Sequence, residues 1–517
     1  MTAGNAELRP QERSTAGRSD HDTIRARARR DWAEAAPVER IAAVLLGVIA
    51  LAMRLAHVRQ VMRHDEAFTY LHYARAPLSV ALSDYTYPNN HLFHTLLVWF
   101  STRLFGPSEV AVRLPAFVFG MLIVPATYRL ARRFTDRGAS LLAMALAAVW
   151  PTLVLYSTNA RGYSFIAFVF VVMLLLGDEI VERDTWGRWV ALALLFALGM
   201  YTAPLMLYAG GAVLVWIVAE KARRDGIAAA RALLPGLVAS AVLAAVITVL
   251  VNVPVVRSTG LASLVANKYV TALSPRELVA ALPEFAGSLK ESLALGVPLP
   301  LAALLVVCAV AGVVTPDAER GRRVVLACTV LGWCALVLVA TRRPPPGRVL
   351  LFLVPLFCVF AGRGIALGVA WAARRTPARV STACATIALV LAVLFGASVV
   401  HRRVVFRTPE TGTLADAPAI ADYLLGALRE GDRIVVMNPS DPPLDYYLLR
   451  RGGRRLDEIN ARAAAREGRV FVVVNPKHLQ TLPVVQAGAP DVPWSELTPD
   501  GAPVEFQPET VYRFRRR

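Results

Sequence analysis

Apolar runs recur from Ile41 to about Val400, and short polar turns separate them. Most runs reach or approach the about 20 residues that a helix needs to cross the hydrocarbon core of a membrane. A polar, Arg-rich stretch precedes them, and a region of mixed character follows them. The pattern therefore predicts an α-helical polytopic membrane domain at 38–400, with about eleven transmembrane helices.

The region 401–517 has a different pattern. It predicts a helix at 416–429, a strand at 433–437, a second helix at 442–450 and a second strand at 470–474. Such an order is typical of a small α/β domain. The region contains no Gly-rich phosphate loop, so we interpret it as an accessory module.

Positive charge orients the spans. The tail at 1–37 is rich in Arg, and we expect it to be disordered and cytoplasmic. We place the basic turn at 129–137 on the cytoplasmic side as well. The later basic turns then also lie on the cytoplasmic side, and the turns between them lie outside. This orientation places the first span at about 38–58, a first outer loop at 60–112, a second large outer loop at 257–295 and the C-terminal domain on the extracytoplasmic side. The short apolar stretch 91–105 is then an interfacial helix.

In the second loop, Ser274 and Glu277 have the spacing of a capping box. We expect the amphipathic segments of both loops, 67–112 and 257–295, to form the walls of a cavity.

Composition narrows the function. The chain has a net charge of +18, but its positive residues lie mostly at span ends, which argues against a nucleic-acid partner. The five Cys residues lie in apolar runs and form no CxxC pair, which excludes a disulfide framework or a zinc site of that kind. One outer turn, 341–348, is positive on the side where positive charge is rare. This turn indicates an anionic ligand.

Two adjacent carboxylates, Asp65 and Glu66, follow His64 directly after the first span, and His64 is itself a candidate substrate-binding residue. Carboxylates at a membrane edge cost solvation energy, and they are often functional. One of them could accept the proton of an attacking hydroxyl. The alternative is that the pair caps a helix that begins near Ala67, where negative charge suits the helix dipole.

A second polar cluster follows in the same loop. Its side chains offer hydrogen-bonding groups of the kind that bind sugars, beside aromatic rings. His91 and His94 are spaced i, i+3 and could bind a divalent metal ion, but the alternative is an Asx-turn and N-cap. Metal dependence stays open, and no other cofactor is indicated. The candidate substrate-binding residues here are Asp84, Asn89, Asn90, His91 and His94.

Three Arg residues, Arg113, Arg161 and Arg348, are predicted at the outer membrane edge. Arg suits phosphate because its guanidinium donates in a fork, and fixed positive charge stabilises an anionic leaving group. The alternative for each one alone is a side chain that reaches from the bilayer to water.

The order of these motifs resembles the GT-C superfamily of integral membrane glycosyltransferases. The similar branch is glycosyltransferase family 39, which is related to protein O-mannosyltransferases and lipid A aminoarabinose transferases. The resemblance covers about residues 40–365. Besides the acidic pair, the motifs that support it are Leu-Phe-Gly at 104–106, Arg-Leu-Pro at 113–115, Leu-Ala-Arg-Arg-Phe at 130–134 and Tyr-Ser-x-x-Ala-Arg-x-Tyr at 156–163.

The resemblance implies inverting transfer of a hexosyl or pentosyl group from a polyprenyl-phosphate sugar to an acceptor hydroxyl on the outer face of the cell membrane. The acceptor would be a lipid, a glycan or a protein. Asp65 matches the catalytic base and Glu66 its neighbour, while Arg348 matches a residue that contacts the lipid phosphate. Arg161 and Tyr163 stand at the end of the motif at 156–163, and we include both among the candidate substrate-binding residues. The chain departs from relatives at Val349, where an aromatic residue is common, and at Asn159, where an acidic residue is common.

A transporter or flippase for a lipid-linked sugar is the alternative. Such proteins usually place ionisable groups near the middle of the membrane, and many contain inverted repeats. Here the polar residues gather at the outer edge and the sequence shows no repeat. A sensor without catalytic activity would leave the crowded first loop unexplained. These patterns favour the transferase.

Overall fold

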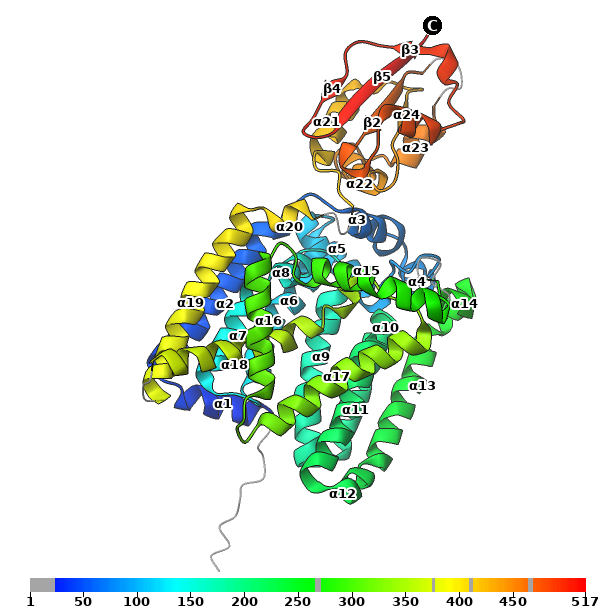
Figure 1. Cartoon of the computed structure of the whole chain (residues 1–517). Coiled ribbons are helices and arrows are strands. Elements are labelled where there is room, and N and C mark those ends of the chain that lie inside the picture. Colours follow the sequence, from blue (N-terminus) through cyan, green and yellow to red (C-terminus); the bar gives the residue numbers. More distant parts are fainter. Residues whose placement is uncertain (1–23, 266–270, 374–376, 409–411, 464–467) are drawn as a thin grey trace, which may run out of the picture.

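The computed structural model contains a helical bundle with a small α/β domain at one end (Figure 1). It describes residues 24–265, 271–373, 377–408, 412–463 and 468–517. The helices of the bundle are α1 (Ile24–Glu34), α2 (Pro37–Val58), α3 (His64–Thr69), η1 (Tyr70–Ala74), α4 (Leu78–Ser83), α5 (Leu92–Phe105), α6 (Glu109–Ala131), α7 (Arg137–Val149), α8 (Pro151–Ser157), α9 (Tyr163–Glu182), α10 (Trp186–Thr202), α11 (Met206–Asp225), α12 (Ile227–Ala232), α13 (Leu234–Thr259), α14 (Leu261–Val265), α15 (Pro275–Leu293), α16 (Leu299–Val314), α17 (Arg320–Thr341), η2 (Gly347–Leu350), α18 (Leu353–Ala373), α19 (Pro377–His401) and α20 (Val404–Arg407).

Several of these helices can cross a membrane. Within the described ranges, 7 helices are long and apolar enough, or up to 8 if the bent pair α7 and α8 forms one span. The helices α5, α10 and α16 are apolar but shorter. The prediction of a polytopic helical membrane protein is confirmed, whereas the count of about eleven spans and the interfacial position of α5 stay predictions.

Burial separates central from peripheral helices. In α9, 89% of the most apolar window is buried inside the protein, against 17% in the helix that spans Ile227–Thr259. The chain bends by 55° between α7 and α8 at Trp150, because the residue before a proline is disfavoured in the helical conformation. The bend directs the end of α8 toward the polar turn that precedes α9.

The N-terminal tail differs from the expectation in part. Disorder was expected over 1–37, but α1 is a helix, and residues 1–23 lie outside the described residues. Asp31 pairs with Arg132 at 3.2 Å, and Glu34 pairs with Arg137 at 3.0 Å. These partners come from a turn about 100 residues later, so the local Arg-rich pattern does not reveal the ion pairs that hold the helix.

The helix α13 continues to Thr259 and so overlaps the start of the second outer loop predicted at 257–295. The main element of this loop is the amphipathic helix α15. As the sequence indicates, Ser274 and Glu277 form a capping box: the Ser274 N–H donates to the Glu277 carboxylate at 2.7 Å, and the Glu277 N–H donates to the Ser274 hydroxyl at 3.3 Å. The apolar side of α15 packs on the bundle core through residues such as Phe285 and Leu289.

The C-terminal region contains the predicted α/β arrangement and more strands than expected. Its sheet has the order β1-β2-β5-β3, with β4 paired to β5; β1 and β2 are parallel, and β5 is antiparallel to its neighbours. Its elements are α21 (Ala417–Ala427), β1 (Arg433–Val435), α22 (Asp441–Gly452), α23 (Leu456–Ala461), β2 (Val470–Val474), η3 (Pro476–His478), α24 (Leu482–Ala487), η4 (Trp494–Glu496), β3 (Leu497–Pro499), β4 (Val504–Glu505) and β5 (Thr510–Arg516).

This domain rests on the first outer loop, where α22 meets α3 (Figure 1). One buried apolar cluster includes Met62 and Tyr70 from the loop and Leu444 and Tyr447 from α22. The rings of Tyr70 and Tyr446 lie edge to face at 5.7 Å. A shared core of this kind fixes the domain beside the acidic pair, since apolar side chains from both sides are withdrawn from water together.

Candidate active site

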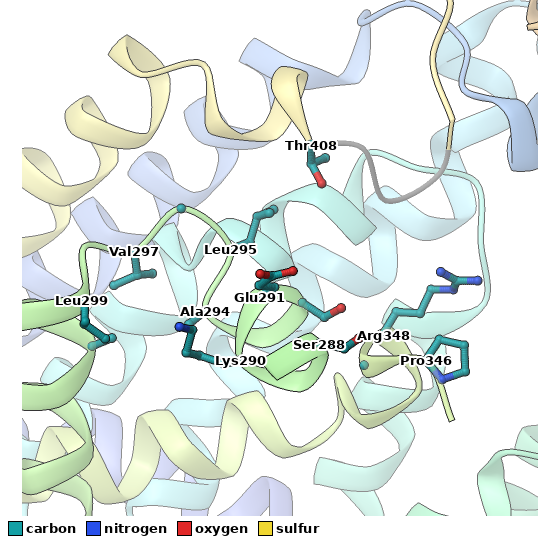
Figure 2. A pocket seen from close by; sticks show the side chains of 14 residues that line it. Ser288, Lys290, Glu291, Ala294, Leu295, Val297, Leu299, Pro346, Arg348 and Thr408 are labelled. Atoms are coloured by element: carbon teal, nitrogen blue, oxygen red, sulfur yellow. The ribbon is translucent and has the colours of Figure 1, made fainter. Parts of the chain in front are cut away.

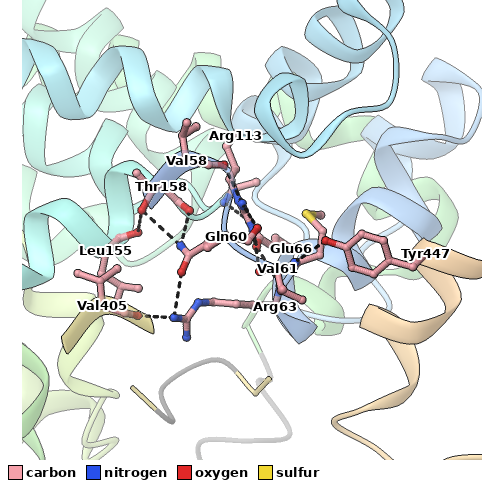
Figure 3. A network of polar contacts seen from close by, with 12 residues as sticks. Val58, Gln60, Val61, Arg63, Glu66, Arg113, Leu155, Thr158, Val405 and Tyr447 are labelled. Carbon is pink, nitrogen blue, oxygen red and sulfur yellow. Dashed lines mark hydrogen bonds and ion pairs between the residues drawn. The ribbon is translucent and has the colours of Figure 1, made fainter. Parts of the chain in front are cut away.

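The loop that follows α2 is held by a buried ion pair (Figure 3). Glu66 and Arg113 are both fully buried, and Arg113 Nε donates to Glu66 Oε2 at 2.9 Å while Nη2 contacts Oε1. The same guanidinium donates to the carbonyl oxygens of Val58, Gln60 and Val61 at 2.6–3.0 Å. Arg113 thereby fixes the turn between α2 and α3 against α6.

Glu66 has further donors on both sides. Its Oε1 accepts from the Arg63 N–H at 2.9 Å, which is half of a capping box, and its Oε2 accepts from the Ala160 N–H at 3.0 Å. Of the two roles considered for the acidic pair, catalysis and helix capping, Glu66 therefore has the capping role. Enclosed in this way, Glu66 positions the loop, and the structure gives it no face toward a substrate.

Asp65 lies on the open side of the same helical turn. Its side chain is 14% exposed, one carboxylate oxygen is paired with Arg161, and the other accepts from Asn89 Nδ2 at 3.2 Å. Thr69 adds a hydrogen bond from its hydroxyl to the Asn89 carbonyl oxygen at 3.3 Å. The carboxylate is therefore oriented by two partners, and part of it faces solvent.

Tyr163 joins two cationic side chains. Its hydroxyl oxygen accepts from Arg161 Nη2 at 3.3 Å and from Arg348 Nε at 3.2 Å. Arg161 also pairs with Asp65, so one guanidinium connects the carboxylate to the second cation. The structure thus brings together Asp65, Arg161, Tyr163 and Arg348, which come from separate parts of the sequence.

Two buried histidines, His91 and His94, lie near Arg161. His91 accepts from the Gly162 N–H through Nδ1 at 3.1 Å, and its Nε2 lies 3.4 Å from Arg161 Nη2. Burial, and next the charge of Arg161, hold the pKa of His91 well below its ordinary value. His94 is fully enclosed, neither ring nitrogen has a hydrogen-bond partner among the described residues, and burial lowers its pKa to about 3.

Three predicted substrate-binding residues make their hydrogen bonds outside this cluster. Asp84 accepts from the Thr86 N–H at 2.9 Å and forms an Asx-turn. The buried Asn90 donates to the carbonyl oxygens of Ala81 and Asp84, and so stabilises the same turn. His64 turns toward the C-terminal domain, with Nδ1 3.2 Å from the Pro439 carbonyl oxygen. With Arg113, these residues lie around the cluster rather than inside it.

A cavity of about 580 Å³ opens beside Arg348 (Figure 2). Arg348 and Pro346 stand at one end, and Val297 and Leu299 at the other. The rest of its lining comes mostly from the end of α15 and the turn that follows it, with single residues from α16, from η2 and from the segment after α20. These residues are Ser288, Lys290, Glu291, Ser292, Ala294, Leu295, Gly296, Ala302, Gly347 and Thr408. One end is therefore charged and the other apolar, as an amphiphilic ligand requires.

The metal hypothesis gains no ligand set. Within the ranges that the structure describes, no three His, Cys, Asp or Glu residues come together so as to hold a metal ion. His91 Nδ1 accepts from the Gly162 N–H and His91 Nε2 faces the guanidinium of Arg161, so His91 has no nitrogen free for an ion shared with His94.

Sequence reasoning missed two parts of the site. Gly162 permits close approach, because a Cβ there would lie 2.4 Å from Thr202 Cγ2 and 2.7 Å from His91 Nδ1. Lys290 and Glu291 line the cavity from the last turn of α15. The amphipathic pattern identified α15 as a cavity wall, but a helical pattern does not tell which neighbour completes the cavity.

Acid is expected to destabilise the protein through His94. Its pKa falls from 6.5 to about 3 on folding, so the unfolded chain binds the proton that the folded chain excludes. The contribution is fully present above pH 6.5 and is lost as the pH falls toward the folded pKa. The loss is about 1.4 kcal/mol per pH unit, or about 2 kcal/mol at pH 5. Unfolding midpoints in detergent between pH 8 and 5 should fall less steeply for His94→Gln than for wild type, and equal slopes would contradict this.

Known proteins are similar to the chain in sequence and in fold. Residues 88–251 match the family described as dolichyl-phosphate-mannose-protein mannosyltransferase. No curated protein sequence gives a significant match. The structure is similar to ArnT from Cupriavidus metallidurans in the apo state, with 15% identity, a TM-score of 0.57 and coverage of 91% of this chain and 97% of that one. ArnT bound to undecaprenyl phosphate gives a TM-score of 0.55 at the same identity and coverage.

The archaeal oligosaccharyltransferase AglB from Archaeoglobus fulgidus, solved with an inhibitory peptide and a dolichol-phosphate, gives a lower TM-score of 0.46 at 14% identity, covering 83% of this chain and 65% of that one. The ArnT structures establish the shared fold. Together with the matched segment, they bear out the predicted resemblance to the GT-C superfamily of membrane glycosyltransferases.

Proposed function

We propose that this chain transfers a sugar from a polyprenyl-phosphate donor to an acceptor hydroxyl on the outer face of the cell membrane, with inversion at the anomeric carbon. The observation that supports this most directly is the position of Arg161. It contacts Asp65 on one side and, through the hydroxyl of Tyr163, joins Arg348 on the other. A proton acceptor and a pair of cations are thereby held at a fixed separation, as group transfer from phosphate requires.

Asp65 is the general base in this proposal. Its carboxylate takes the proton of the acceptor hydroxyl while the hydroxyl oxygen forms a bond to the anomeric carbon. The bond between that carbon and the phosphate oxygen breaks on the opposite face of the sugar. Asn89 and Arg161 orient the carboxylate, and Glu66 with Arg113 fixes the loop that presents it.

The leaving polyprenyl phosphate is placed at the charged end of the cavity. Arg348 lines this cavity and, with Arg161, stabilises the negative charge that develops on the phosphate oxygen. The apolar lining at Val297 and Leu299 suits the first isoprene units of the lipid. The undecaprenyl phosphate found in the similar ArnT structure supports a ligand of this class.

The test is release of polyprenyl phosphate by the purified protein from a panel of polyprenyl-phosphate sugars, followed by mass spectrometry. Release that depends on an added acceptor is the expected result, and the productive donor identifies the sugar. If the protein binds the lipid-linked sugar and moves it between the leaflets of proteoliposomes without cleavage, the flippase alternative replaces the transferase.

Loss of the Tyr163 hydroxyl is expected to weaken donor binding. Tyr163→Phe keeps the ring, which lies 5.1 Å from His91 and 5.0 Å from Tyr156, but removes the acceptor that Arg161 and Arg348 share. A hydrogen bond to a charged group is worth about 1.5–3 kcal/mol, so KM for the donor should rise about tenfold or more. Steady-state kinetics measures this change, and an unchanged KM would contradict the assigned role.

A further inference from the structure

A row of rings borders the proposed base on the outer surface. His64, Phe68 and His72 follow at intervals of four residues along α3 and the π-helix η1, so their rings lie on one face. The rings of Phe68 and His72 stack at 4.0 Å with an interplanar angle of 19°. Tyr87 meets Phe68 edge to face at 5.2 Å. We call these four residues the aromatic platform.

The platform is accessible and its rings are fixed. His72 and Tyr87 are exposed, and His64 and Phe68 are half-buried. His72 Nδ1 lies 3.1 Å from the Phe68 carbonyl oxygen, and His64 Nδ1 lies 3.2 Å from that of Pro439. Because a carbonyl oxygen only accepts, each Nδ1 is the donor, and in the neutral ring Nε2 is left as an acceptor.

Polar groups surround the platform. Asp65 is next to His64 in the chain, and it is bonded to Asn89, which lies two residues after Tyr87. On the other side, Asp441 at the start of α22 interacts electrostatically with His64 and His72. Burial raises the pKa of Asp441, and its Oδ1 is buried without a hydrogen-bond partner among the described residues. The C-terminal domain thus places a carboxyl group within electrostatic range of both histidines.

We infer that the acceptor is a carbohydrate, whose sugar rings lie on the aromatic platform while a hydroxyl reaches Asp65. This inference rests on the proposed function and specifies its acceptor. The C–H face of a pyranose or furanose ring carries slight positive charge, which suits the negative face of an aromatic ring. The hydroxyls at its edge match carboxylate, amide and imidazole groups such as those of Asp65, Asn89 and Asp441.

The geometry favours a glycan over a peptide. Peptides that bind in extended form pair with a free strand edge, and a helical peptide needs an apolar groove. The platform is built on α3 and η1, whose backbone groups are already bonded within the helices. The exposed rings of His72 and Tyr87, bordered by acceptors, match the alternation of apolar face and polar edge that a sugar presents.

The test measures binding to full-length protein in lipid nanodiscs by saturation-transfer NMR. The probes are neutral hexasaccharides of glucose, mannose and arabinose, a Ser/Thr-rich decapeptide, and undecaprenyl phosphate. At least one hexasaccharide should receive saturation at its ring C–H protons. Tyr87 is the test position because its ring is exposed, whereas one face of Phe68 is covered by His72. Tyr87→Leu should weaken that binding about threefold to tenfold, whereas Tyr87→Phe, which keeps the ring, should stay within about twofold of wild type.

Each outcome decides a separate statement. If the peptide receives saturation and no hexasaccharide does, the carbohydrate acceptor is overturned. The transferase proposal then stays in place, provided undecaprenyl phosphate still binds. Equal saccharide binding by Tyr87→Leu and Tyr87→Phe, with unchanged unfolding midpoints, also overturns the carbohydrate acceptor. If wild-type protein does not bind undecaprenyl phosphate, the result argues against the transferase proposal itself, whether or not the saccharides bind.

Discussion

Replacement of Asp65 by asparagine is expected to lower sugar transfer by about 10²–10⁴-fold, which is the range over which a general base contributes. Asn keeps an oxygen for Arg161 and the size of the side chain, but it does not accept the proton of the attacking hydroxyl. The donor should still bind, because Arg348 and the cavity are unchanged. Polyprenyl phosphate release measures transfer, and native mass spectrometry measures retention of the lipid.

Asp84→Asn is the matched control for this prediction. Asp84 lies in the same outer loop, but it accepts from Thr86 within an Asx-turn, and asparagine keeps that oxygen. Its activity should stay within about twofold of wild type, since surface changes away from a site have small effects. A fully active Asp65→Asn protein, or equal losses in the two variants, would remove Asp65 from the role of base.

Breaking the buried ion pair is expected to have the largest effect on stability. Glu66→Ala would leave Arg113 buried without its carboxylate, and removal of one partner of a buried pair typically costs about 3–5 kcal/mol. The loop that presents Asp65 would lose its anchor at the same time, so transfer activity should fall with stability. Unfolding midpoints and denaturant titrations in detergent measure this loss.

The control is an ion pair nearby that is open to solvent. Glu109 and Arg450 lie 3.7 Å apart, with side chains 22% and 35% exposed, and connect α6 to α22. Glu109→Ala should cost no more than about 1 kcal/mol, because exposed pairs are screened by water and salt. If Glu66→Ala proved as mild as Glu109→Ala, the anchoring role of Glu66 would be refuted.

Local information predicted the elements of this protein well. A transmembrane helix is specified by an apolar run of sufficient length, and α2 begins and ends within a residue of the predicted first span. The capping box at Ser274 and Glu277 is likewise present, since both partners lie within one helical turn. The strands β3 and β4 were not predicted, because they are two or three residues long and pair with β5. The strand β5 was not predicted either, because its three Arg residues conceal an apolar pattern.

The roles within the site depended on partners that are remote in sequence. Asp65 and Glu66 are adjacent, and successive side chains on a helix point about 100° apart, so one must face the core when the other faces out. Sequence does not tell which, because the answer depends on Arg113 and Ala160, 47 and 94 residues after Glu66.

The sequence by itself thus determined the membrane class, the helical order and the loop that holds the acidic pair, because hydropathy and capping act over a few residues. Only the tertiary structure decided that Asp65 meets Arg161, that Tyr163 joins Arg161 to Arg348 and that the C-terminal domain borders the aromatic platform. The physical reason is that burial and ion pairing depend on which distant segments pack together, and this is a property of the whole fold.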